Sequence, residues 1–168
     1  RFVSTILVKE NPRIVYHPCV GSFATVTSMV SAGYSAGQIE TSDFSLFSTI
    51  IGYAVDGTKD VRDLGLTIPE ELDVLRPQEG DGEVEFASKY LLALQYLRTN
   101  PKNAYMSAVR DELIGNRAFY LNNISNKLTE MILALTGVKY ERRDVREVVN
   151  LVRTGDEDEF FYITPPSG

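Results

Sequence analysis

Helical periodicity through the middle of the chain, with short β-type segments toward both ends, is the feature that most constrains the fold. Apolar residues line two faces of a helix from Glu83 to Leu97, and between Leu121 and Leu135 they recur every three or four residues. Segments rich in β-branched and aromatic residues occupy 2–9, 13–19 and 160–163. Strands, then helices, then a short strand indicate an α+β fold rather than a regularly alternating parallel one.

The first two β segments predict an N-terminal β-hairpin. They flank a turn signal at residues 10–12, and Pro18, which has no amide hydrogen, marks the end of the second strand. Ser22 and Ser42 stand where they would cap the two helices that follow. We expect a short strand at 138–142 and helices at about 23–32, 43–55, 69–75, 83–97, 101–115, 121–135 and 145–154.

Length and composition suit a single globular domain over residues 1–168. Of the 168 residues, 43% are hydrophobic and 24% are charged, which is ordinary for a chain that buries one core. The single cysteine cannot form an internal disulfide, which favours a reducing compartment, and we expect a cytoplasmic or virion protein. The longest apolar runs, such as residues 131–135, are too short to cross a bilayer, so no membrane partner is expected. A start at Arg1 indicates processing or a fragment.

Charge is unevenly spread along the chain, whose net charge is −6. Residues 154–168 carry four acidic groups and no basic one, which predicts an acidic tail that could be flexible. Residues 101–153 are net positive, and their densest basic cluster could bind RNA through one helix face. That cluster consists of Arg142, Arg143, Arg146 and Arg153. The interleaved acids Glu141, Asp144 and Glu147 favour a salt-bridged surface instead, so nucleic acid is an alternative partner only.

His17 and Cys19 are the only histidine and the only cysteine, and they stand two residues apart at the end of a predicted strand. Residues at this spacing project to one face, so a thiol nucleophile with its base is a candidate catalytic pair. No third residue is evident that would orient the histidine, and free cysteine is among the most buried residue types. We therefore interpret Cys19 as a buried, inert core residue and keep a thiol hydrolase or transferase as an alternative.

No motif for a cofactor or a metal ion is present in the sequence. Neither the dinucleotide pattern G-x-G-x-x-G nor the P-loop pattern occurs. One histidine and one cysteine are too few for a transition-metal site, and the acidic turns at 56–60 and 79–83 lack the spacing of a calcium loop. We therefore expect no cofactor, no metal ion and none of the familiar nucleotide enzymes.

The absence of a catalytic motif favours a noncatalytic structural or assembly protein, and a viral or phage origin is a further hypothesis. Four consecutive large apolar residues follow the acidic stretch 156–159, and an extended strand would present them on both faces: Phe160, Phe161, Tyr162 and Ile163. Such a segment could add to a neighbouring sheet edge, in self-association or on a protein partner, or it could close the sheet of its own domain.

Overall fold

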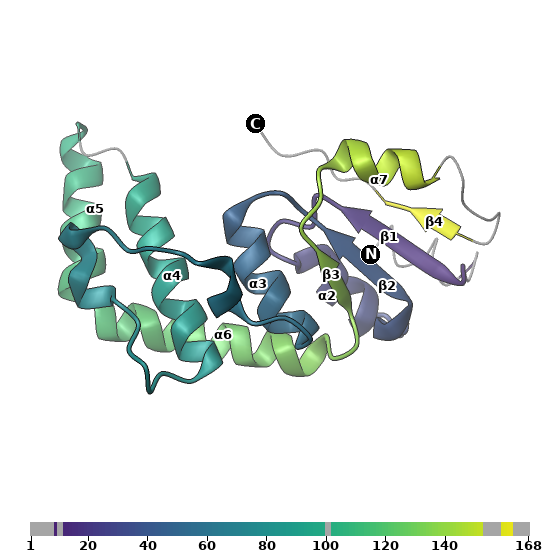
Figure 1. Ribbon diagram of the computed structural model, residues 1–168, viewed down its shortest axis with the longest axis horizontal. Helices are drawn as coiled ribbons and strands as arrows, with labels where there is room; N and C mark the ends of the chain where they lie inside the picture. Colours follow the sequence, from purple (N-terminus) through teal and green to yellow (C-terminus); the bar gives the residue numbers. More distant parts are fainter. Residues whose placement is uncertain (1–8, 10–11, 100–101, 153–158, 163–168) are drawn as a thin grey trace. The chain divides into compact units, whose positions relative to one another are not determined.

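The computed structural model describes residue 9 and residues 12–99, 102–152 and 159–162 (Figure 1). The chain divides into two compact units, residues 1–58 with 131–168 and residues 59–130, and each is described by itself. No helix in the described ranges is both long enough and apolar enough to span a membrane.

The first unit is built on a parallel sheet of four strands in the order β3-β2-β1-β4 (Figure 1). The strands are β1 (Ile14–Pro18), β2 (Ile39–Ser42), β3 (Lys139–Glu141) and β4 (Glu159–Phe161). All three neighbouring pairs run parallel. The unit also contains helices α2 (Ala24–Ser31), α3 (Leu46–Asp56) and α7 (Val145–Val152) and a 3-10 turn, η1 (Ala36–Gln38).

One face of this sheet forms the core of the first unit. Side chains alternate along a strand, and the register places His17, Thr41 and Tyr140 in one row across β1, β2 and β3. All three are buried. The ring of Tyr140 lies directly against Gly52 of α3, where an added Cβ would stand 2.3 Å from the ring Cγ. Glycine at this position therefore lets α3 approach the sheet closely enough to cover it.

The second unit is helical. It contains the 3-10 segments η2 (Val61–Leu64) and η3 (Glu70–Leu75), and the helices α4 (Glu83–Arg98), α5 (Ala104–Gly115) and α6 (Arg117–Ala134), the last of which continues into the first unit. Six residues of α4 are buried, which confirms that it is a core helix. Lys89 of α4 is anchored by Asp81, with 2.6 Å between Nζ and the carboxylate.

The predicted α+β class is confirmed, including the mainly helical middle of the chain and the short strand near the C-terminus. The strand predicted at 13–19 is β1 and the one predicted at 138–142 is β3. The helices predicted at 83–97 and 121–135 lie within α4 and, for all but the last residue, α6.

The strand pairing differs from the prediction. Most of the expected first strand, 2–9, lies outside the described residues, and its one described residue, Lys9, is helical. The neighbours of β1 are β2 and β4, both parallel to it, rather than an antiparallel hairpin partner. The cause is that β-branched residues favour an extended strand in either orientation, so their pattern does not name the partner.

Candidate ligand site at the carboxyl edge of the sheet

Parallel pairing brings the carboxyl ends of the strands to one edge of the sheet. From β1 the order continues through β2 to β3 on one side, whereas β4 lies on the other side of β1. In open parallel sheets such a reversal leaves a crevice beyond the carboxyl ends, where ligands bind. Here the reversal lies between β1 and β4, beside the turn that leads from β1 to α2.

Alternate residues of the turn between β1 and α2 adopt left-handed backbone conformations. The φ angles are 58° at Cys19, 59° at Gly21 and 63° at Phe23. A side chain makes this conformation unfavourable by about 1–3 kcal/mol, so Cys19 and Phe23 are held there by their surroundings. The ring of Phe23 is fully buried, with its centroid 6.0 Å from that of Tyr140. Gly21 faces open space, since an added Cβ would meet no atom within 4 Å.

Helix α2 begins at this turn without a side-chain cap. Its N-cap residue is Phe23, and no side chain of the described residues accepts a hydrogen bond from the first-turn amides, so the prediction that Ser22 caps the helix is wrong. Free amides and the helix dipole make such an end electropositive and suited to a polar or anionic group.

Asp43, which directly follows β2, ties the two neighbouring turns together. Its carboxylate accepts hydrogen bonds from the backbone N–H of Gly21, at 3.0 Å, and from that of Ser45, at 2.8 Å. The Asp43 carbonyl accepts a hydrogen bond from the Tyr140 hydroxyl at 2.8 Å. Burial raises the pKa of this hydroxyl, so it stays protonated and able to donate. A buried side chain of β3 thus holds the residue that shapes the turn after β1.

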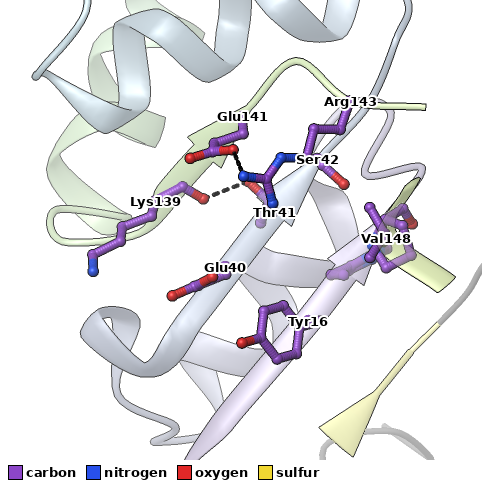
Figure 2. A pocket seen from close by; sticks show the side chains of 10 residues that line it. Tyr16, Glu40, Thr41, Ser42, Lys139, Glu141, Arg143 and Val148 are labelled. Atoms are coloured by element: carbon purple, nitrogen blue, oxygen red, sulfur yellow. Dashed lines mark hydrogen bonds and ion pairs between the residues drawn. The ribbon is translucent and has the colours of Figure 1, made fainter. Parts of the chain in front are cut away.

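A pocket of about 160 Å³ lies over the same strands, at side chains that alternate with the buried row and so point to the other face of the sheet (Figure 2). Tyr16, Glu40 and Lys139, which are aligned across β1, β2 and β3, form its floor, and Val148 of α7 borders it. Arg143 forms an ion pair with Glu141 at the carboxyl end. Glu40 stands 19 residues after Gly21. In dinucleotide-binding units an acidic residue about 20 residues after the first glycine binds ribose hydroxyls, and Glu40 has that chemistry and that spacing.

His17 is only 1% exposed, and it lines the same pocket. Its Nδ1 lies 3.1 Å from the Pro18 carbonyl, and its ring packs edge-on against Tyr162 at a centroid distance of 5.1 Å. Its Nε2 is buried without a hydrogen-bond partner among the described residues. Burial lowers the pKa of the imidazole, which favours the neutral form.

The structure does not join His17 to Cys19 as a catalytic pair. The Nδ1 of His17 is directed at a backbone carbonyl, and its Nε2 has no partner in the described part of the chain. The prediction that Cys19 is a buried core residue is wrong, because its side chain is partly exposed. Its partial burial raises the pKa of the thiol, as do the nearby carboxylates of Asp43 and Asp144. A raised pKa opposes the thiolate form that nucleophilic catalysis requires.

The predicted basic cluster is partly neutralised. Arg143 pairs with Glu141, and Arg146 pairs with Asp144 at 2.7 Å, as the interleaved acids predict. Arg142 behaves differently: its guanidinium carbon lies 5.1 Å from the ring centroid of Phe44. Arg153, the fourth predicted member, lies outside the described residues.

The apolar segment predicted at 160–163 contributes to the domain's own sheet. Strand β4 pairs with β1, with Phe160 opposite Val15 and Phe161 opposite Tyr16. Tyr162 is half-buried against His17, and Ile163 lies outside the described residues. Of the two roles considered for this segment, sheet closure is therefore observed, and contact with another molecule stays a prediction.

Sequence reasoning missed the site residues Gly21, Glu40 and Asp43. The available signal was a strand followed by a glycine turn and a helix, with an acidic residue about 20 positions further on. It was obscured because Phe23 and Cys19 occupy left-handed positions where glycine is usual.

Of the comparisons with known proteins, the one against family models gives a match. Residues 2–167 match the family model described as Phage DNA Adenine Methylase-like domain 1. The chain belongs to this family. The chain is thus a phage-related protein, in keeping with the phage origin suggested by its sequence. No curated protein and no solved structure matches it.

Proposed function

We propose that the first unit binds the methyl donor in a phage protein of the DNA adenine methylase type. The observation that carries the proposal is the strand order β3-β2-β1-β4, which puts the order reversal beside the glycine turn of β1. The family description supports the reaction class. Methyl transfer to an adenine requires a donor such as S-adenosylmethionine, a nucleoside that carries a methyl group on a sulfonium and supplies it as an electrophile.

Residues of the pocket and of the turn after β1 fit the nucleoside part of such a donor. Glu40 lies in the pocket with a carboxylate suited to accept hydrogen bonds from ribose hydroxyls. Gly21 leaves open space above the turn, so a ligand can approach the backbone closely.

The protein's own groups have distinct tasks under this proposal. Glu40 orients the sugar, and Asp43 holds the turn at Gly21 in the observed shape. This proposal replaces the expectation of no cofactor, which rested on the absence of linear motifs rather than on geometry.

The proposal predicts that Glu40→Gln weakens S-adenosylmethionine binding about tenfold or more, because a hydrogen bond to a charged group contributes about 1.5–3 kcal/mol. Isothermal titration calorimetry on the full chain measures this, with S-adenosylhomocysteine as a second probe. Glu71→Gln, a change at an exposed glutamate of the second unit, is the control and should bind as the wild type does. Equal affinity in all three proteins, or no binding at millimolar donor, would contradict the proposal.

Protein-protein contact remains a second candidate function, and one observation favours it. In the described sheet β4 is an edge strand, and such an edge can accept a strand from another molecule. The native mass of the chain at high concentration is the measurement that decides it, since a strict monomer leaves self-association without support.

A further inference from the structure

An exposed aromatic ring and an arginine lie together at the carboxyl edge of the sheet. Phe44 is two residues beyond β2 and is 64% exposed. Arg142 directly follows β3, the neighbouring strand, and its guanidinium carbon lies 5.1 Å from the Phe44 ring centroid. Both residues therefore stand at the edge where the methyl-donor site is proposed.

This pair has features that its neighbours lack. The adjacent arginines, Arg143 and Arg146, are matched with carboxylates, whereas the described residues provide no ion pair for Arg142. A phenylalanine this exposed does not stabilise the fold by burial. The carboxylate of Asp43, next to Phe44, is directed at the Gly21 and Ser45 amides and so is already occupied. The ring and the guanidinium thus present an apolar plane beside an unneutralised positive charge.

We infer that Phe44 and Arg142 form a stacking platform for a base of the DNA strand; this inference rests on the proposed function. Enzymes that modify a base draw it out of the duplex or act on single strands, and the exposed base then stacks on aromatic side chains. Such stacking contributes about 1–3 kcal/mol per base, and arginine adds attraction to the base and the phosphate. Single-stranded DNA that contains adenine is therefore the ligand assigned to this platform.

The first test uses fluorescence, because the chain contains no tryptophan. Phe44→Trp places the only tryptophan of the chain on the platform, and a DNA single strand of about 12 nucleotides containing adenine should quench its fluorescence on stacking. Phe119→Trp is the matched control, since Phe119 is 62% exposed but belongs to the second unit. Quenching at position 44 and not at position 119 is expected. Equal quenching at both positions, or none at 44 while DNA binds, would overturn the platform.

The second test measures affinity for the same DNA by fluorescence anisotropy. Phe44→Ala and Arg142→Ala should each weaken binding about fivefold or more, by the size of one lost stacking contact. Phe119→Ala and Arg117→Ala, changes at exposed residues of the second unit, should leave affinity within twofold of the wild type. If RNA of the same sequence binds more tightly than the DNA, the assignment to DNA is wrong.

Methyl-donor binding separates this inference from the function on which it rests. Phe44→Ala should bind S-adenosylmethionine with unchanged affinity. Donor binding without quenching at position 44 would remove the platform and leave the proposed function in place. Quenching by DNA in a protein that binds no donor would remove the proposed function and leave the platform as a DNA-binding site.

Discussion

At the scale of single residues, His17 couples the site to the stability of the first unit. It is the only histidine, it is buried, and its burial lowers the pKa below the unfolded value of 6.5. The unfolded chain therefore binds a proton at a pH where the folded chain does not, so stability is lost as the pH falls below about 6.5.

This predicts that the free energy of unfolding falls between pH 7 and pH 5 by up to about 1.4 kcal/mol per pH unit. Urea unfolding of the wild type and of His17→Asn at several pH values measures the effect. In the variant the free energy of unfolding should change less steeply with pH over this range. Parallel slopes would mean that the imidazole titrates alike in both states.

Gly52 is the residue on which the packing of α3 against β3 depends. In Gly52→Ala the new Cβ would stand 2.3 Å from the Tyr140 ring, which is itself held by hydrogen bonds. Overpacking of this kind costs about 1–3 kcal/mol, and more where the ring cannot move. We expect a loss of at least about 2 kcal/mol by urea unfolding. Gly37→Ala, where a Cβ meets no atom within 4 Å, is the control and should change stability little.

At the scale of the elements, two serines test where the helices begin. Ser45 caps α3, because its hydroxyl accepts a hydrogen bond from the Ser48 N–H, at 3.2 Å. Ser22 precedes α2 and does not cap it, and Ser42 ends β2 instead of starting α3. The sequence pattern placed the caps at Ser22 and Ser42 because serine suits turns as well as helix starts.

We expect Ser45→Ala to lower the free energy of unfolding by about 1 kcal/mol, the usual cost of losing a serine N-cap. Ser22→Ala should change it by less than about 0.5 kcal/mol, as at an exposed position without such a role. Thermal and urea unfolding measure both variants. The reverse order would show that the hydroxyl of Ser22 caps α2 in solution.

At the scale of the whole molecule, the second unit is an insertion. The chain leaves the first unit after Thr58 and returns to it at Met131, between β2 and β3. Both ends of the second unit continue into the first unit, so unfolding of the first unit removes the constraint on both ends of the second. We therefore keep the prediction, made from length and composition, that residues 1–168 fold as one domain.

Phe44→Trp and Phe119→Trp report on the two units separately, one probe in each. If the chain is one cooperative domain, the two probes should show the same urea midpoint and the same slope. Far-ultraviolet circular dichroism on both variants measures the loss of secondary structure and so gives a third unfolding curve that does not depend on tryptophan. Midpoints that differ by more than the fitting error would show that the units unfold independently.

Local patterns in the sequence were sufficient for the elements. The apolar residues of 83–97 and 121–135 recur at helical spacing, and that spacing is a property of neighbouring residues. The same holds for the strand at 13–19 and for the ion pairs of Arg143 and Arg146, whose partners stand two residues away. The sequence by itself therefore determined the element types, the α+β class and much of the local charge pairing.

Only the tertiary structure decided which strands pair and what their ends bring together. Thr41 and Tyr140 lie side by side although 98 residues separate them, and Asp43 reaches Gly21 across two turns. Partners this distant are selected by the packing of whole helices and strands, which no short window of sequence encodes. The parallel sheet, its carboxyl edge and the pocket at Glu40 follow from that packing, and so the candidate site could be recognised only once the strands were in register.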